Sequence, residues 1–174
     1  PQAFYGGTRM RRDDVLAAAL AHGTELVELT GGEPLLQPGT RPLLRALCDP
    51  GRTVLLETSG EADVSDVDPR VHKIMDLKAP GSGEAHRNRW SNLAHIGPAD
   101  ELKIVLASRE DYEWARAVIR ERALAQRTPH VLLSTVFGRL APRDVVAWVL
   151  ADKLPVRVQL QMHKYIWAPD AQGV

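Results

Sequence analysis

The sequence predicts an α/β fold, and two patterns support that prediction. Six short β-like runs recur along the chain, and each ends in polar or glycine-rich residues. Amphipathic helical patterns lie between several of these runs. Alternating strands and helices are joined by right-handed crossovers that pair the strands in parallel. We therefore expect either an open doubly wound sheet or a full or partial barrel.

The individual elements follow in chain order. An apolar helical face at residues 15–20 precedes Gly23, which is expected to form the C-terminal cap. Residues 43–48 repeat the helical spacing, Ser108 is expected to cap the N-terminus of a third helix, and Pro142 opens a fourth. The expected strands are residues 25–30, 53–58, 72–78, 101–106, 130–136 and 156–162. Residues 79–98 are expected to form a long loop with one short helix around Trp90, of the kind that covers a site.

Polar and apolar side chains alternate along several expected strands. In the last one, the residues that share the polar face are Arg157, Gln159, Gln161 and His163, opposite Val156, Val158, Leu160 and Met162. A sheet covered by helices on both faces is apolar on both. The alternation therefore predicts a charged cavity at the C-terminal strand ends, where α/β folds bind ligands. Polar groups that pair with one another, or face solvent on an uncovered sheet, would give the same pattern.

Composition excludes several classes of protein. The chain has 174 residues and a mean hydropathy of −0.22, which suits one globular domain. Its 22 basic and 22 acidic residues cancel, so nucleic acid is not an expected partner. The apolar runs are far shorter than the roughly 20 residues that cross a bilayer. The first ten residues lack the charged-then-apolar order of a signal peptide. A single cysteine cannot form an internal disulfide. We therefore expect a cytoplasmic setting.

A series of motifs follows the expected strands. The segment TGGEP, residues 30–34, places two glycines where a backbone can approach a ligand, and a carboxylate that can accept from an ammonium group. Alone it could be an ordinary strand-ending turn. It is followed, however, by ETSG at 57–60, DLKAP at 76–80, ELKIV at 101–105 and QMHKY at 161–165.

This ordered series resembles the radical S-adenosylmethionine (radical SAM) enzymes over nearly the whole chain, and within them the 7-carboxy-7-deazaguanine synthases of queuosine biosynthesis. The resemblance implies a partial, modified TIM-type barrel with about six parallel strands in this chain. It also implies S-adenosylmethionine, a [4Fe-4S] cluster and Mg²⁺ as cofactors, and 6-carboxy-5,6,7,8-tetrahydropterin as substrate. A 5′-deoxyadenosyl radical would take a hydrogen from the pterin, and ring contraction with loss of ammonia would give 7-carboxy-7-deazaguanine. A homodimer and an electron donor such as flavodoxin are expected partners.

One departure from that family concerns the metal. The three-cysteine cluster loop and the Asp-Thr that serves magnesium are absent, and Cys48 is the only thiol. Because such a cluster takes three protein thiolates, this chain alone is not expected to hold the cluster. Without the Asp-Thr pair it is not expected to hold magnesium either. The ligands are expected before Pro1, so residues 1–174 would form a single, N-terminally incomplete radical SAM core that is inactive by itself. Cys48 lies on a leucine-rich helical face and is expected to be a buried structural thiol.

The resemblance also assigns roles to individual positions. The residues that would contact the substrate are Thr30, Gln161 and His163. Those that would contact S-adenosylmethionine are Gly31, Gly32, Glu33, Ser59, Asp76, Lys78 and Ser134. The structural alternatives are an ordinary turn at Ser59, an ion pair of Asp76 with Lys78 or Lys103, and a purely structural strand histidine at position 163.

Two rival functions follow from the same residues. A different radical SAM enzyme, such as a glycyl-radical activase, would share the cofactor turns but not the QMHKY segment. The second rival is a non-catalytic α/β domain that keeps the barrel, has lost the cluster, and binds a partner or a small molecule. The sequence upstream of Pro1 separates that last possibility from the enzymes.

Overall fold

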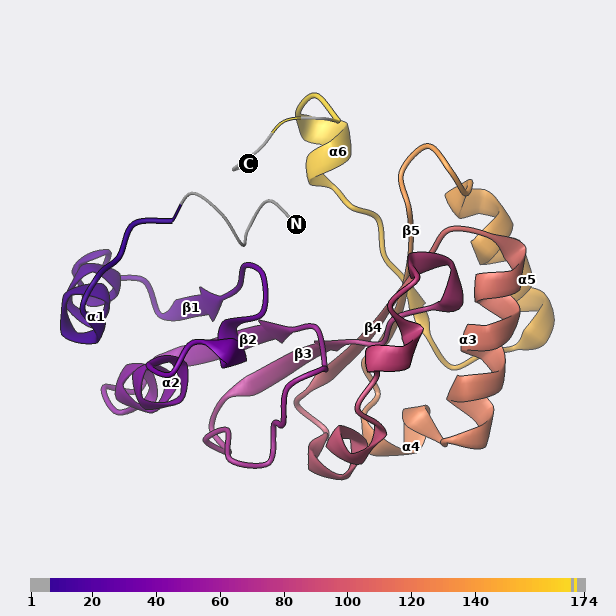
Figure 1. Ribbon diagram of the computed structural model, residues 1–174. Coiled ribbons are helices and arrows are strands. Elements are labelled where there is room, and N and C mark those ends of the chain that lie inside the picture. Colours follow the sequence, from indigo (N-terminus) through magenta and orange to yellow (C-terminus); the bar gives the residue numbers. More distant parts are fainter. Residues whose placement is uncertain (1–6, 170, 172–174) are drawn as a thin grey trace. The chain divides into compact units, whose positions relative to one another are not determined.

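The computed structural model describes residues 7–169 and 171 (Figure 1). The chain divides into two compact units, which we describe separately. Unit 1 comprises Pro1–Asp76 and Arg89–Asp100, and unit 2 comprises Leu77–Asn88 and Glu101–Val174. The expectation of one domain over residues 1–174 stays a prediction.

Unit 1 is a parallel three-stranded sheet with helices (Figure 1). Its strands lie in the order β1, β2, β3, and Leu26 pairs with Thr53 while Leu55 pairs with His72. The elements are α1 (Arg12–Ala21), β1 (Leu26–Leu29), the 3-10 helix η2 (Pro34–Leu36), α2 (Thr40–Cys48), β2 (Thr53–Thr58), β3 (His72–Asp76) and the 3-10 helix η5 (Trp90–His95). As expected, Gly23 adopts a left-handed φ of 68° after α1, and its N–H donates to Leu20 O at 3.1 Å.

The core of unit 1 lies between α2 and the sheet. Apolar side chains recur at helical spacing on α2, and alternate residues of β2 share one face of the sheet. The buried members of this core include Leu43, Leu44, Leu47 and Cys48 from α2, with Val54 and Leu56 from β2. Helix α1 has no fully buried residue and adds only partly buried side chains to the cluster. One face of β2 is buried, whereas its other face, which carries Glu57, is partly accessible.

Unit 2 repeats the arrangement with parallel strands in the order β4, β5, β6. Its elements are the 3-10 helices η3 (Pro80–Ser82) and η4 (Ala85–Arg87), β4 (Glu101–Leu106), α3 (Arg109–Glu121), α4 (Leu124–Arg127), β5 (Val131–Thr135), α5 (Pro142–Asp152), β6 (Arg157–Val158) and α6 (His163–Ile166). The two predicted helix starts are confirmed, since Ser108 Oγ accepts from Asp111 N at 3.3 Å and Pro142 is the first residue of α5. Every residue of β5 is buried.

The predicted α/β class is therefore confirmed, with six strands that pair in parallel within their units, as in a partial TIM-type barrel. The predicted last strand, however, is wrong beyond Val158. Gln159 N still donates to Leu133 O at 2.9 Å, but the chain then leaves the sheet, and His163 begins α6. Leu160 and Met162 are 45% and 68% exposed, so no buried face extends the strand. Residues 79–98 also differ, since they form three short 3-10 helices instead of one.

Candidate functional site

The turn after β1 carries the glycine pair of the first motif. Gly31 and Gly32 have φ angles of 99° and 57°, which side chains other than glycine adopt at a cost. Just before them, the exposed Thr30 donates its hydroxyl proton to Glu57 Oε2 at 2.8 Å. The turn therefore brings bare backbone and a hydroxyl oxygen to the carboxyl ends of β1 and β2.

Glu33 joins this turn to the end of β2. Glu33 as a whole residue is 5% exposed. Oε1 accepts from Leu35 N at 3.0 Å, while Oε2 accepts from Ser59 N at 2.7 Å and from Ser59 Oγ at 2.5 Å. Thr58 Oγ1 donates to both oxygens, at 3.0 and 2.9 Å. Two predicted cofactor residues, Glu33 and Ser59, are thus in direct contact with each other.

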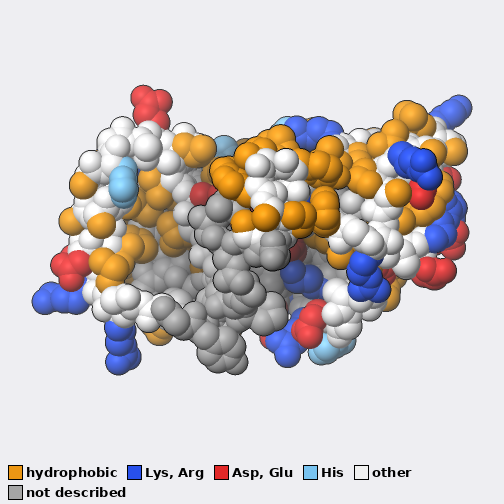
Figure 2. All heavy atoms as spheres, turned by 90° about the horizontal axis from the view of Figure 1, so that it is seen from above, with side chains coloured by type: hydrophobic (Ala, Val, Ile, Leu, Met, Phe, Trp, Pro, Cys, Tyr) orange, Lys and Arg blue, Asp and Glu red, His pale blue; other side chains and the backbone are white. Residues whose placement is uncertain are grey.

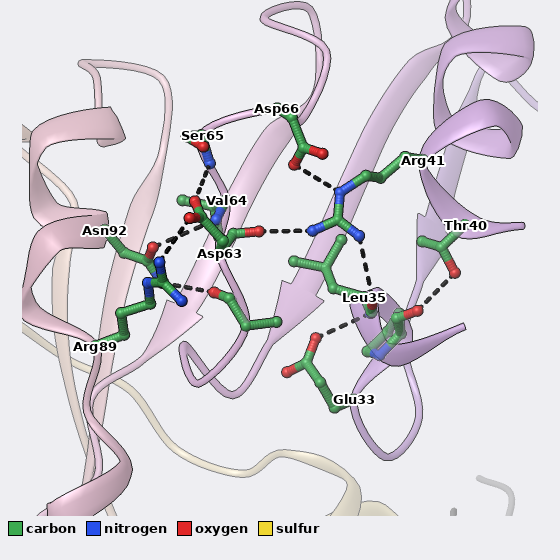
Figure 3. Close-up of polar contacts among 12 residues, drawn as sticks. Glu33, Leu35, Thr40, Arg41, Asp63, Val64, Ser65, Asp66, Arg89 and Asn92 are labelled. Carbon is green, nitrogen blue, oxygen red and sulfur yellow. Dashed lines mark hydrogen bonds and ion pairs between the residues drawn. The ribbon is translucent and has the colours of Figure 1, made fainter. Parts of the chain in front are cut away.

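Helix α2 ties the same two loops together from the other side (Figure 3). Arg41 donates to Leu35 O at 3.2 Å in the first loop and to Asp63 O at 2.8 Å in the second, and it pairs with Asp66 at 2.6 Å. Thr40 Oγ1 donates to Pro34 O at 2.6 Å. Thr40 and Arg41 thus hold backbone oxygens of both loops. Helix α2 therefore sets the spacing between the glycine turn and the segment after Ser59.

A buried asparagine holds the segment that follows Ser59. Asn92 is 1% exposed and donates to Gly60 O at 3.1 Å and Ala62 O at 2.7 Å. It also accepts from Val64 N at 3.3 Å (Figure 3). Gly60 itself has φ 75°, and a Cβ there would lie 3.0 Å from the carbonyl oxygen of Asp76. Sequence reasoning missed Asn92, since a single asparagine in a loop gives no signal of the backbone it serves.

An ion pair completes this segment: Asp63 pairs with Arg89 at 2.7 Å, and the pKa of Asp63 is lowered chiefly by the hydrogen bond from the Ser65 backbone N–H.

The predicted residues of unit 1 lie at neighbouring strand ends. At the end of β3, Asp76 follows Met75, the partner of Thr58 in the sheet register. The predicted residues of unit 1, namely Thr30, Gly31, Gly32, Glu33, Ser59 and Asp76, therefore gather at the carboxyl ends of β1, β2 and β3.

In unit 2 the residues predicted to contact S-adenosylmethionine lie on two further segments. Lys78 has its backbone clamped by Asn88, whose Oδ1 accepts from Lys78 N at 2.8 Å and whose Nδ2 donates to Lys78 O at 2.9 Å. Ser134 lies near the carboxyl end of β5 and is 3% exposed. A cavity shared by these residues and those of unit 1 stays a prediction.

The C-terminal segment presents Gln161 and His163 differently from the prediction. His163 is the first residue of α6, so strand alternation does not determine where its imidazole lies. Phe137 packs against Tyr165 with ring centroids 5.6 Å apart. Figure 2, which views the molecule from the end where α6 lies, shows hydrophobic side chains gathered on this surface. The exposed large hydrophobic residues in this part of unit 2 are Phe137, Leu160, Met162, Tyr165, Ile166 and Trp167.

The described residues do not fit an iron–sulfur cluster. No group of three or more His, Cys, Asp or Glu placed to hold a metal ion occurs among them. Cys48 is buried in α2, and that burial raises the pKa of its thiol. None of the helices in the described part of the chain is long and apolar enough to cross a membrane.

Comparison with known proteins gives consistent relatives. No protein-family model matches the chain. A protein of Chlorobaculum tepidum called 7-carboxy-7-deazaguanine synthase is 50% identical over 97% of this chain and 77% of its own length. Proteins of the same name from Koribacter versatilis and Clostridium acetobutylicum are 42% and 34% identical, over 98% and 96% of this chain and 82% and 77% of their own lengths.

Proposed function

The chain belongs to the 7-carboxy-7-deazaguanine synthase family, a family of lyases, and on that premise we propose that it forms the core of a radical SAM enzyme of queuosine biosynthesis. This enzyme converts 6-carboxy-5,6,7,8-tetrahydropterin to 7-carboxy-7-deazaguanine with loss of ammonia. The observation that supports it best is the 50% identity to the Chlorobaculum tepidum protein, which extends over 97% of the chain. The relatives favour this reading over a glycyl-radical activase.

The chain's own residues would bind and orient two small molecules. Gly31 and Gly32 have left-handed φ angles and no side chain, so a ligand could approach their backbone closely. Ser59, Asp76, Lys78 and Ser134 would contact S-adenosylmethionine. When bound, S-adenosylmethionine would supply the hydrogen-abstracting group. Thr30, Gln161 and His163 would hold the pterin, so that His163 serves in recognition and no general base is required there. A homodimer, a flavodoxin-type electron donor and a cytoplasmic setting belong to the same proposal.

The cluster requires ligands that these residues lack. Three thiolates are needed and the chain has one cysteine, which is buried. We therefore propose that residues 1–174 by themselves do not cleave S-adenosylmethionine, and that the cluster and magnesium ligands lie outside them.

Anaerobic reconstitution tests the proposal. The full-length protein, treated with iron and sulfide, is expected to become brown. With a chemical reductant such as dithionite and the pterin added, it is expected to cleave S-adenosylmethionine and to form 7-carboxy-7-deazaguanine, detected by mass spectrometry. Residues 1–174 treated in the same way serve as the comparison and are expected to do none of these. A stoichiometric cluster on residues 1–174 that survives Cys48→Ala would contradict the ligand assignment. Cofactor cleavage without pterin turnover would favour another radical SAM activity, and no cleavage by the full-length protein would favour a binding domain.

A further inference from the structure

The hydroxyl of Ser59 has a direction that its sequence motif does not reveal. Ser59 Oγ lies 2.5 Å from Glu33 Oε2. A carboxylate only accepts hydrogen bonds, whereas a serine hydroxyl has one proton to donate and two lone pairs that accept. The proton of Ser59 is therefore committed to Glu33, and its lone pairs are what a ligand can meet.

The Glu33 carboxylate is itself filled by the protein. Four donors reach its two oxygens: the backbone N–H groups of Leu35 and Ser59, and the hydroxyls of Thr58 and Ser59. A carboxylate offers about four lone-pair positions in all. Since Glu33 is also buried, an ammonium group would have to displace one of these donors to bind its carboxylate directly. The carboxylate thus serves the protein, and only Ser59, which is partly exposed, can extend its influence to a ligand.

Thr30 repeats the arrangement at the end of the neighbouring strand. Its hydroxyl donates to Glu57 Oε2 at 2.8 Å, so its oxygen also has only lone pairs to offer. Both hydroxyls predicted to touch a ligand in unit 1 are thus oriented by a carboxylate. Side chains of this kind complement ligand groups that carry N–H or O–H protons, and they do not complement a carboxylate, which has no proton to give.

We propose that Ser59 is a hydrogen-bond acceptor for the bound cofactor, oriented by Glu33 as a positioning residue, and that it recognises an ammonium or hydroxyl group. It does not bind the cofactor carboxylate. The inference rests on the proposed function, because that function supplies the ligand: S-adenosylmethionine has an α-ammonium group and two ribose hydroxyls as donors, and a carboxylate that only accepts. The structure therefore selects among the ligand groups that a strand-end serine could meet.

The test measures which ligand group loses its partner when Ser59 is changed. Binding of S-adenosylhomocysteine to the full-length protein is measured by calorimetry, together with three analogues in which hydrogen replaces the carboxylate, the amino group or the ribose hydroxyls. Ser59→Ala is expected to weaken S-adenosylhomocysteine and the decarboxylated analogue by the same factor, about tenfold. It should leave unchanged the affinity of whichever analogue lacks the donor that Ser59 accepts from, which separates ammonium from hydroxyl. Ser65→Ala, the same change at an exposed serine in the same loop, is the matched control.

A second variant tests the positioning role of Glu33. Glu33→Ala is expected to weaken the same analogues as Ser59→Ala, and the double variant should bind no more weakly than Ser59→Ala alone, because both act through one contact. A merely structural Glu33 would weaken every analogue and add its effect to that of Ser59→Ala. The single variant Ser59→Ala decides the acceptor role even where Glu33→Ala does not fold.

Three outcomes would overturn the inference, and the last of them would overturn the proposed cofactor as well. If Ser59→Ala weakens every ligand except the decarboxylated one, Ser59 donates to the carboxylate and the inference is wrong while the proposed cofactor stands. An unchanged affinity for all four ligands in Ser59→Ala likewise overturns the inference alone. If the unaltered protein binds none of the four ligands, both the proposed cofactor and the inference are overturned.

Discussion

Glu33 illustrates how one residue can be essential to a turn for reasons of hydrogen-bond polarity. Each of its oxygens accepts from a backbone N–H group, Leu35 on Oε1 and Ser59 on Oε2. Glutamine has the same shape but replaces one acceptor by an NH₂ donor. Whichever way the amide is turned, its NH₂ group would face a backbone N–H.

Glu33→Gln is therefore expected to destabilise the protein by about 1–3 kcal/mol, the cost of leaving a buried donor unsatisfied. Urea unfolding followed by circular dichroism measures this. Glu121→Gln, the same substitution at an exposed position at the end of α3, should change the free energy of unfolding by less than about 0.5 kcal/mol. Equal stabilities for the two variants would mean that Glu33 does not hold the turn.

Among the elements, α3 and α5 of unit 2 are joined by a polar cluster at the end of α5. Tyr112 donates to Asp152 Oδ2 at 2.6 Å, and Arg116 donates to Oδ1 at 3.1 Å. The guanidinium of Arg109 lies 4.4 Å from the ring centroid of Trp148 and 5.1 Å from that of Tyr112. The hydrogen bond from Tyr112, and then Arg116, holds the pKa of Asp152 below its ordinary value. Burial, and then the hydrogen bond to Asp152, raises the pKa of Tyr112.

This cluster makes stability depend on pH in a defined direction. Because the folded state lowers the pKa of Asp152, its contribution is present above the pKa of the unfolded chain and is lost as the pH falls through the folded value. Tyr112→Phe removes the first cause of that shift, so the variant should be less stable at pH 7 and should lose less stability between about pH 5 and pH 2. Urea unfolding at several pH values measures both effects. Tyr165→Phe, at an exposed tyrosine in α6, should follow the unaltered protein, and parallel curves for Tyr112→Phe would refute the linkage.

Across the molecule, burial is unevenly distributed among the elements. All residues of β5 are buried, whereas β1 has none that is fully buried, and neither α1 nor α6 has a fully buried residue. Local opening costs least where few apolar contacts must be broken. The amides of β5 are therefore expected to exchange with deuterium most slowly, and those of α1, β1 and α6 fastest.

Hydrogen exchange read by mass spectrometry tests this expectation. Peptides from β2 and β4 provide internal comparisons, since each of those strands buries one face. We expect them to exchange at rates between those of β5 and β1. Protection of α6 equal to that of β5 would show that the exposed apolar side chains of α6 are covered in solution.

The sequence by itself determined the features that depend on near neighbours. Strand and helix alternation, the cap at Ser108, the proline start at Pro142 and the left-handed Gly23 are properties of a few adjacent residues, and the structure confirms them. The placement of the TGGEP, ETSG and DLK motifs at strand ends also followed, because a buried strand with its polar end is a local pattern.

Only the tertiary structure decided which of those residues contact one another. Glu33 and Ser59 are 26 residues apart, and Asn92 reaches Gly60 across 32 residues, so neither contact leaves a mark in local sequence. The early end of the last strand is a similar case, because Leu160 and Met162 alternate correctly but find no buried face to pack against. Periodicity tells which side chains share a face, whereas hydrogen-bond partners depend on chain segments that only folding brings together. For that reason the sequence predicted which motif residues lie at the strand ends, whereas only the fold shows that the hydroxyl of Ser59 donates its proton to Glu33.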